Sequence, residues 1–359
     1  MIRVAHRDLL TFTTAVFTHR GLPPARAAAA AEALCHGDLT GTTSHGLVNL
    51  TRLYLPLFAE SRVDPAADLE VVREVGACAV VDAHRALGLW AAGAAMDLAV
   101  DRAADLGVGL VSVRGATHIG CAGHHAARAV RHGMVGVVMS NCGHQRIARP
   151  PGGARPMLGT NPLSVAVPVA SAPPFVLDMS TTVVPTGRVR AAARAGTRVP
   201  EGWLADDHGA PVTDPAAFDR GAAHLRWLGG TPETGAHKGF GLAIVVEVLS
   251  ALLSGAGFGP SAGAGGRDDD IGVFVMAVAP DLLRPAGTFA ADADELFTTL
   301  LGCPPLDPAR PVRYPGLPEA ETAREHLRAG VPLPDELFAE LCAVAAAADL
   351  PAPAALVTA

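Results

Sequence analysis

The sequence predicts a mixed α/β fold with a helical layer formed by both ends of the chain. Between residues 79 and 179, short strand-like apolar segments alternate with helix-like segments, which is typical of an α/β layer. The first 60 residues and the tail at 318–350 instead carry apolar side chains at helical spacing. A chain of 359 residues has room for two to three domains. We expect a helical N-terminal domain at 1–75, an α/β region at 76–317 and a helical tail at 318–359 that packs on the N-terminal helices.

The elements of the first half follow from apolar spacing. Residues 27–36 form an alanine-rich helical run, and apolar residues recur at helical spacing between 47 and 57. The turn-like segment Gly41-Thr42-Thr43-Ser44 separates the two runs. Further along the chain we expect strands at 79–82, 108–113, 135–140, 163–167 and 175–179, and helices at 91–104 and 123–132.

The second half contains long loops and one strongly apolar helix. Segments 149–160 and 194–236 are rich in Gly, Pro and Asp or poor in apolar runs, so we expect a loop and a long irregular excursion. A helix is expected at 239–253, a loop at 255–270 and a last strand at 271–278. The apolar run 240–258 approaches the length of a membrane span, but its central Glu247 would cost about 2.5 kcal/mol or more in a bilayer. We therefore expect a buried or half-buried helix in a soluble protein.

The composition excludes several classes of protein. The net charge is −7 and no basic block occurs, which argues against a nucleic-acid partner. Half of the residues are hydrophobic and 18% are charged, so the chain can bury a large core and is not disordered. The six cysteines form no CxxC pair, and the N-terminus lacks the apolar core of a signal peptide. We expect a cytoplasmic protein that does not associate with membranes.

Several familiar active-site motifs are absent from the sequence. No GxGxxG follows a predicted strand, and no GxxxxGK[ST] occurs. No GxSxG turn of the kind that carries a nucleophilic serine follows a predicted strand either. A nucleotide, if one binds, must be held by other means.

Two histidines lie in polar turns. His45 stands between Ser44 and Gly46, so it is accessible and can titrate near neutrality as a general acid requires. His118 follows Thr117 after the strand 108–113, at the edge of a sheet where α/β sites gather. The alternatives are a surface or helix-capping histidine at 45 and a loop histidine satisfied by backbone at 118.

Three further segments offer polar groups. Asp178 ends the strand 175–179, where it can accept a hydrogen bond from an imidazole and fix its tautomer, or cap the next turn. Thr160 lies in the turn signal Gly159-Thr160-Asn161-Pro162 and can bind polar groups. His237 and Lys238 precede the helix 239–253, whose free backbone N–H groups favour an anion such as a phosphate. An ordinary helix entrance is the alternative there.

Histidines are crowded between residues 118 and 144. A spacing of seven residues places His118 and His125, or His125 and His132, on one helix face. No cysteine or carboxylate joins them at ligand spacing, and no HExxH motif occurs. We therefore expect no metal site.

Taken together, the order of these motifs resembles the malate/L-lactate dehydrogenase family of the non-Rossmann type. That family includes sulfolactate, ureidoglycolate and diketogulonate dehydrogenases and reductases of cyclic imine carboxylates. The matching segments, between positions 37 and 316, are GDLTGTTSHG, VDAHRALG, GVGLVSVRGATHIGCAG, PPGGARPMLGTNPLSVAVP, LDMSTTVVPTGRVRAAARAG, EGWLADDHGAPVTDP, HKGFGLAIVVEVLSALLSGAGFG and YPG. The resemblance implies a non-Rossmann α/β fold and a homodimer with its active sites near the subunit interface. It also implies hydride transfer between NAD or NADP and C2 of a 2-oxo acid, a 2-hydroxy acid or a cyclic imine.

The resemblance also implies roles for individual residues. His45 matches the family's general acid and base, with Ser44 beside it, and His118 matches a second active-site histidine. Asp178 would hold the acid in the needed tautomer, and Lys238 would bind a phosphate or ribose of the cofactor. The residues expected at the cofactor are Thr160, Leu177, Asp178, Met179, Ser180, His237, Lys238 and Gly316.

The sequence departs from the family on the substrate side. The arginine that usually grips the substrate carboxylate, four positions after the SHG histidine, is Asn49, and Arg52 lies one turn further on. In a regular helix, positions 45, 49 and 52 would share one face. The asparagine before the second histidine is Thr117, and one near the last strand is Asp270.

These departures bear on which substrate the protein uses. With Asn49, Arg52 and Thr117 at the substrate, we expect a specificity shifted away from simple malate or lactate. Two alternatives stay open: a reductase of a biosynthetic imine or ketone without the usual carboxylate, and a silent relative that acts as a binding protein.

Overall fold

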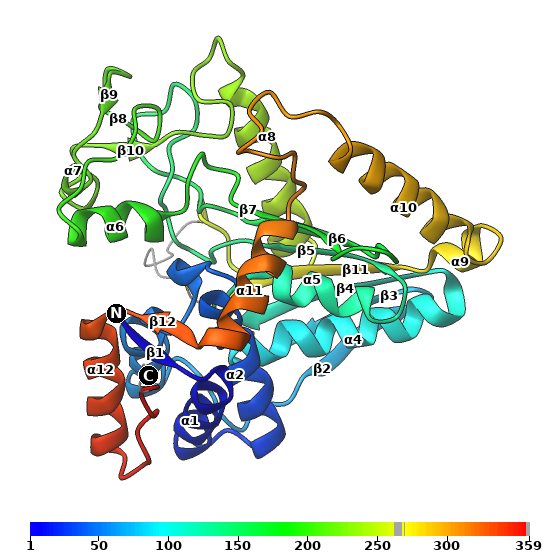
Figure 1. Cartoon of the computed structure of the whole chain (residues 1–359), viewed down its shortest axis with the longest axis horizontal. Helices are drawn as coiled ribbons and strands as arrows, with labels where there is room; N and C mark the ends of the chain where they lie inside the picture. The colour runs from blue at the N-terminus through cyan, green and yellow to red at the C-terminus, as the bar shows by residue number, and fades with distance from the viewer. Residues whose placement is uncertain (262–267, 269, 357–359) are drawn as a thin grey trace.

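The computed structural model describes residues 1–261, 268 and 270–356, and its centre is a seven-stranded sheet (Figure 1). The strand order is β2-β3-β4-β11-β5-β6-β7. Strands β3 and β4 pair in parallel and all other neighbours pair antiparallel, so the predicted mixed α/β fold is confirmed. These strands are β2 (Glu70–Val75), β3 (Cys78–Asp82), β4 (Val108–Ala116), β5 (Val135–Ser140), β6 (Leu163–Val167), β7 (Phe175–Met179) and β11 (Ile271–Val278).

Helices cover both faces of this sheet and build a separate layer beside it (Figure 1). The α-helices are α1 (His6–His19), α2 (Pro24–Leu39), α3 (Leu55–Ala59), α4 (Gly88–Leu106), α5 (Ala122–Val130), α6 (Thr186–Arg194), α7 (Ala216–Asp219), α8 (Ala236–Val246), α9 (Pro280–Leu283), α10 (Thr288–Leu301), α11 (Leu317–Ala329) and α12 (Asp335–Ala347). A 3₁₀-helix, η1 (Thr43–His45), and two π-helices, η2 (Leu50–Tyr54) and η3 (Glu247–Leu252), complete the set.

Strand glycines let the helices approach the sheet closely. A Cβ atom at Gly109 in β4 would overlap the backbone oxygen of Ala99 in α4, and one at Gly272 in β11 would overlap that of Ser250 in η3. Gly109 pairs with Ala277, which lies five residues from Gly272 along β11. Because successive residues of a strand alternate between faces, α4 and η3 cover opposite faces of the sheet. Small side chains at these contacts are why the core needs few aromatic residues.

The two ends of the chain lie side by side (Figure 1). Strand β1 (Ile2–Val4) pairs antiparallel with β12 (Val331–Leu333), α11 contacts α2, and α12 contacts η2. The helical layer predicted from both termini is therefore present in the fold. The boundaries at 75 and 317 stay a prediction.

Several elements differ from the sequence-based expectation. The excursion 194–236 is not irregular throughout, because it contains α7 and a small sheet of β8 (Leu204–Ala205), β9 (Pro211–Val212) and β10 (His224–Leu225). Strands of two residues are too short to show an alternating pattern. Strand β2, strand β12 and helix α10 were likewise not expected, and every residue of β2 is exposed. The expected loop at 255–270 lies partly outside the described residues, at 262–267 and 269.

The apolar run near residue 247 forms the continuous helix α8–η3, as expected. Glu247 is 6% exposed, and Asn141 Nδ2 donates a hydrogen bond of 3.0 Å to its carboxylate. This hydrogen bond satisfies the Oε2 atom and lowers the cost of placing a carboxylate in the middle of the helix. None of the described helices has the length and apolar character needed to span a membrane.

Candidate active site

His45 lies on η1, the short turn between α2 and the next helix. Ser44 Oγ is 2.9 Å from His45 Nδ1, and Asn49 Nδ2 donates a hydrogen bond of 2.9 Å to the backbone oxygen of Ser44. Both Ser44 and His45 are half-buried. Burial lowers the pKa of His45 below its ordinary value of 6.5, so the neutral imidazole dominates at pH 7.

His118 stacks on His45. The two rings have centroids 5.8 Å apart and planes inclined by 23°. Tyr54 Oη lies 2.8 Å from His118 Nδ1, and the backbone N–H of Gly120 donates to the same nitrogen at 3.2 Å. Because a backbone N–H can only donate, Nδ1 is the acceptor and the neutral ring carries its proton on Nε2. Burial, with a smaller contribution from His45, lowers the pKa of His118 to about 4.

Tyr54 is a site residue that the sequence did not reveal. It ends η2, and the helix after Gly46 is therefore not the regular one that would align positions 45, 49 and 52 on a single face. Single π-turns inside helices occur frequently at functional sites. Tyr54 fitted the apolar spacing of residues 47–57 and is fully buried, so nothing in the pattern distinguished it from a core residue. Burial raises the pKa of Tyr54 well above 10, which keeps the phenol protonated.

The residues expected at the substrate have partners inside the chain. Asn49 is bonded to Ser44, and Arg52 forms an ion pair of 3.5 Å with Glu340 of α12. Thr117 is buried and its Oγ1 accepts a hydrogen bond of 2.9 Å from the backbone N–H of Gly88. Thr117 also lines a pocket, whereas Arg52 does not.

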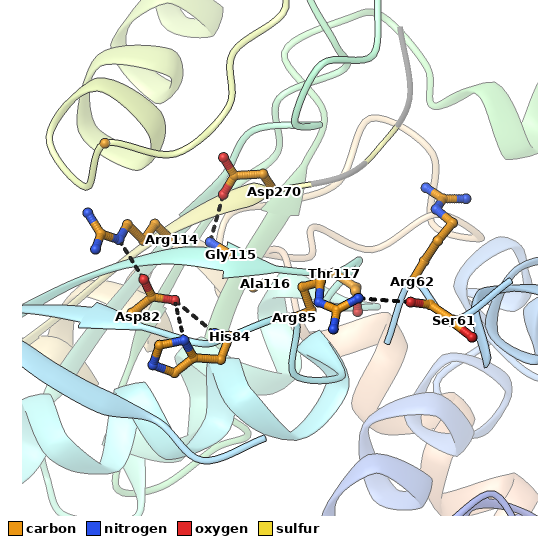
Figure 2. A pocket seen from close by; sticks show the side chains of 11 residues that line it. Ser61, Arg62, Asp82, His84, Arg85, Arg114, Gly115, Ala116, Thr117 and Asp270 are labelled. Carbon is orange, nitrogen blue, oxygen red and sulfur yellow. Dashed lines mark hydrogen bonds and ion pairs between the residues drawn. The ribbon is translucent and has the colours of Figure 1, made fainter. Parts of the chain in front are cut away.

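The pocket that adjoins Thr117 has a volume of about 490 Å³ and lies at the carboxyl ends of β3 and β4 (Figure 2). Figure 2 shows Arg85 directed toward Ser61, and Arg85 Nη1 donates to the Ser61 backbone oxygen at 2.9 Å. Arg114 Nε donates to Asp82 at 2.9 Å. A third arginine of the pocket, Arg62, forms an ion pair with Asp268. The guanidinium groups of Arg62 and Arg114 are therefore paired with carboxylates, and that of Arg85 is bonded to a backbone carbonyl.

The backbone around this pocket is strained. Four of its lining residues, Ser61, His84, Arg85 and Asp270, have positive φ angles between 48° and 65° although none is a glycine. Such a conformation costs a non-glycine residue about 1–2 kcal/mol and tends to occur at functional sites. The departure at Asp270 has a structural role here, because its Oδ1 accepts a hydrogen bond of 2.8 Å from the Gly115 N–H.

A second group of candidate residues gathers along β7. Asp178 Oδ2 accepts a hydrogen bond of 2.7 Å from the backbone N–H of Gly123 at the start of α5. The Val176 N–H donates a hydrogen bond of 3.0 Å to the backbone oxygen of Pro315, which brings the turn with Gly316 against the same strand. Gly316 has a φ of 97°, and a Cβ atom there would lie 2.7 Å from the Val176 nitrogen, so only glycine fits.

The segment after β7 leads to the start of α8. The N–H and Oγ1 of Thr181 both donate to the Thr160 backbone oxygen at 2.9 Å. The Leu228 N–H donates to the Thr181 backbone oxygen at 3.0 Å, and the Gly239 N–H donates to the Leu228 backbone oxygen at 3.2 Å. The exposed pair His237-Lys238 therefore lies near the segment that follows β7. We call β7, the Gly316 turn and the first turns of α5 and α8 the nucleotide strip. The exposed side chain of Lys238 suits a nucleotide with anionic phosphates. The backbone N–H groups at the two helix starts, those of Gly123, Ala236, Lys238 and Gly239, are already bonded within the chain.

Asp178 belongs to the nucleotide strip and does not contact His45. Its hydrogen bond goes to Gly123, while Ser44 occupies the Nδ1 side of His45. The expected role of Asp178 in fixing the His45 tautomer therefore has no contact to support it. Desolvation of the carboxyl group by the surrounding protein raises the pKa of Asp178 to about 6. The hydrogen bond from Gly123 opposes this shift, and the negative charge of Glu319 on α11 adds to it.

Other histidines form a cluster between α2 and α5. His124 packs against His36 and His125, with ring centroids 5.0 Å and 5.1 Å apart. Burial is the main reason why the pKa values of His36 and His125 fall to about 4. Among the described residues no three metal-ligating side chains are placed to hold an ion together.

Comparison with known proteins gives the same family at the level of sequence and of fold. The pattern of the family described as "Malate/L-lactate dehydrogenase" matches residues 4–342. The chain is 38% identical over 255 residues to the malate dehydrogenase of Pyrococcus horikoshii, which covers 71% of this chain and 69% of that protein. The malate dehydrogenase structure from Entamoeba histolytica superimposes with a TM-score of 0.92 at 27% identity, over 98% of this chain and 99% of that one. A delta1-piperideine-2-carboxylate reductase from Pseudomonas syringae gives a TM-score of 0.83 at 27% identity, over 96% and 100%.

Proposed function

Because the chain belongs to the malate/L-lactate dehydrogenase family and is thereby an NAD(P)-dependent dehydrogenase, we propose that it moves hydride to or from C2 of a 2-oxo or 2-hydroxy acid. The observation that carries this proposal is the cluster of His45, His118 and Tyr54, which we call the proton-transfer cluster. It combines a titratable, half-buried imidazole with a second imidazole of defined tautomer.

In this proposal His45 exchanges the proton with the substrate oxygen. Ser44 Oγ lies at Nδ1, so Nε2 is the nitrogen left to serve the substrate. Because Nε2 exchanges the proton, Nδ1 keeps its hydrogen in both protonation states of the ring, and the Ser44 hydroxyl accepts that hydrogen bond in both. The neutral form that burial favours is the base for oxidation, and the protonated form is the acid for reduction.

His118 is proposed to position and polarise the reacting group. Tyr54 and Gly120 occupy its Nδ1, so its Nε2–H is available to donate a hydrogen bond to a substrate oxygen. The low pKa keeps His118 neutral near pH 7, so it does not compete with His45 as the acid.

The nucleotide strip is proposed to hold the cofactor. A nicotinamide dinucleotide supplies or accepts the hydride when it is bound. Lys238 is proposed to pair with a phosphate or a ribose hydroxyl, and its exposed position at the start of α8 supports this. The residues proposed to contact it are Thr160, Leu177, Asp178, Met179, Ser180, His237, Lys238 and Gly316.

The substrate is proposed to differ from simple malate or lactate. Asn49 cannot offer a carboxylate the charge and two-pronged geometry of an arginine. Loss of a charged partner costs about 1.5–3 kcal/mol, or roughly 10- to 150-fold in affinity. Arg52 would have to leave Glu340 to replace it. The pocket lined by Thr117, the residue before His118, offers further polar groups to such a substrate.

A cyclic imine carboxylate is the second candidate substrate. The similarity to the Pseudomonas syringae reductase over nearly the whole chain favours it. The same proton donor would serve this reaction, because His45 would protonate an imine nitrogen in place of a carbonyl oxygen.

We further propose a homodimer in the cytoplasm. Helix α8–η3 exposes Ile244, Val245, Val248, Leu252 and Leu253 by 42% to 54%, an apolar face that a second copy would bury. All six cysteines carry free thiols, which supports a reducing compartment. Light scattering that reports a monomer at micromolar concentration would contradict the dimer.

A cofactor-linked screen tests the proposed function. NADH and NADPH are each combined with pyruvate, oxaloacetate, larger 2-oxo acids and cyclic imine carboxylates, and oxidation of the cofactor is followed by absorbance. We expect turnover with at least one larger substrate and weak turnover with pyruvate. A ligand at 100 times its Kd stabilises a protein by about 2.7 kcal/mol, so thermal shift with each cofactor is a parallel readout. No turnover and no shift would favour the silent relative.

A further inference from the structure

Asp38 is a buried carboxylate for which the proposed chemistry has no use. It lies in the last turn of α2, is 2% exposed, and its Oδ2 accepts a hydrogen bond of 2.6 Å from the backbone N–H of Leu47. Leu47 comes two residues after His45 and is fully buried. One oxygen of Asp38 is thus tied to the chain segment that carries the proposed proton donor.

The contact between α2 and this segment is unusually close. A Cβ atom at Gly46 would overlap the Asp38 carboxylate, and one at Gly37 would lie 2.7 Å from the Gly46 nitrogen and 2.8 Å from the carbonyl carbon of His45. Two glycines on facing segments therefore let the backbone of the turn rest directly on the helix. The carboxylate leaves no room for the turn to move toward α2.

The end of α2 is itself fixed from the other side. His326 Nδ1 of α11 lies 3.0 Å from the backbone oxygens of both Asp38 and Leu39. Gly41, just beyond the helix, is close to Thr322 of the same helix α11. The end of α2 is thus held by α11, and the Asp38 side chain links this helix end to the turn through Leu47.

We propose that Asp38 is a positioning residue that holds the turn Thr43–Leu47, and with it His45, in the geometry for proton transfer. The inference rests on the proposed role of His45. Leu47 N–H has its acceptor only while an oxygen is present at position 38, because the segment is buried and closed to water. Loss of that oxygen releases the turn on the side where Ser44 and His45 meet the substrate.

Matched variants test this inference through kcat at saturating cofactor and substrate. Asp38→Ala removes the acceptor, and Asp38→Asn keeps an oxygen within reach of Leu47. Thr13→Val is the control. Thr13 lies on α1, and its Oγ1 is 3.5 Å from the sulfur of Cys35 on α2, the helix that carries Asp38, so the change affects α2 away from the turn. We expect Asp38→Ala to lower kcat about tenfold or more, since a 1 Å misplacement can cost about a hundredfold. Asp38→Asn is expected to recover most of kcat, and Thr13→Val to lower the melting temperature alone.

A spectroscopic readout separates positioning from general destabilisation. The imidazole resonance of His45, assigned by its disappearance in His45→Gln, is expected to shift in Asp38→Ala and to stay in place in Asp38→Asn and Thr13→Val. An unshifted His45 resonance in folded Asp38→Ala, or a kcat equal to that of the wild type, overturns the inference. If Asp38→Ala does not fold, Asp38→Ser is used with the same criteria, because its shorter side chain cannot span the distance to Leu47.

The outcome remains distinct from the fate of the proposed function. If His45→Ala keeps the wild-type rate, His45 is not the proton donor and the proposed function fails at that point. The His45 resonance still reports whether Asp38 holds the turn, since it requires neither cofactor nor substrate.

Discussion

The proton-transfer cluster and the nucleotide strip are built in different ways. In the cluster, side chains contact side chains: Tyr54 meets His118 across 64 residues of sequence, and His118 stacks on His45. In the strip, backbone groups and glycines make most contacts, as where Gly123 N–H binds Asp178 and Gly316 rests on β7. One region therefore depends on particular functional groups, and the other on the absence of side-chain atoms.

This difference predicts how each region responds to substitution. Removing a functional group from the cluster should reduce the rate of the chemical step and leave cofactor binding intact. Adding atoms to the strip should weaken cofactor binding and leave the chemical step intact once the cofactor is bound. Variants that break this pattern would show that the two regions act as one.

The largest effect is expected for His45→Ala. General acid–base catalysis typically contributes about 10²–10⁴-fold, so kcat should fall by that factor. The dinucleotide Kd, measured by quenching of the three tryptophans, should stay within about twofold of the wild type. His19→Ala, at an exposed position of α1, is the control and should change neither quantity. A variant that retains more than roughly a tenth of the rate would remove His45 from the mechanism.

Gly316→Ala should weaken cofactor binding by roughly tenfold or more. The added Cβ collides with β7, and the left-handed backbone at φ 97° costs a further 1–2 kcal/mol or so. Gly287→Ala is a matched control, since Gly287 also precedes a helix with a positive φ of 77° but has open space around it. Equal dinucleotide Kd values for both variants, measured by tryptophan quenching, would show that the crowding at β7 is irrelevant.

Tyr54→Phe should lower kcat about two- to tenfold, the size of one net hydrogen bond. The change leaves His118 Nδ1 with the Gly120 N–H as its donor, so the ring is held less firmly. Thr51→Val in the same π-helix removes a hydroxyl that bonds to Glu340 and serves as the control. Steady-state rates at saturating substrate check the prediction, and an unchanged kcat in Tyr54→Phe would exclude Tyr54 from the cluster.

Some residues were predictable because their chemistry is local. Ser44, His45 and Gly46 form a short motif, and β3 to β7 show apolar runs that identify strands without knowledge of the rest of the fold. Tyr54 was not predictable, because its partner His118 is brought to it by a π-turn that no sequence pattern marks. The partner of Asp178 was missed for a different reason, since Gly123 contributes only a backbone N–H, which every residue except proline carries.

The smallest effect concerns stability and pH. Burial lowers the pKa of His36 from its ordinary value of 6.5, which it keeps in the unfolded chain, to about 4 in the folded protein. Between these values the unfolded chain therefore binds more protons than the folded one. The contribution of His36 to stability is complete above pH 6.5 and is lost as the pH falls toward 4. When the pH falls from 7 to 5, the melting temperature of His36→Gln should therefore fall by a few degrees less than that of the wild type. Asp38 and Asp178, whose pKa values are raised, act in the opposite direction but are shared by both proteins.

Thermal unfolding of both proteins across this pH range checks the sign. The difference between their melting temperatures at pH 7 is the reference, since His36 is neutral in both folded and most unfolded molecules there. Parallel curves for the two proteins from pH 7 to pH 5 would show that His36 is not buried in its neutral form.

The central claim is that His45 exchanges the proton while the nucleotide strip binds the cofactor. Single-turnover reduction at saturating cofactor and substrate, recorded from pH 5 to pH 9 for wild type and His45→Ala, tests it most directly. We expect the wild-type rate to fall as the pH rises through the pKa of His45, and the His45→Ala rate to be slow and independent of pH. The same pH dependence and a comparable rate in both proteins would contradict the claim.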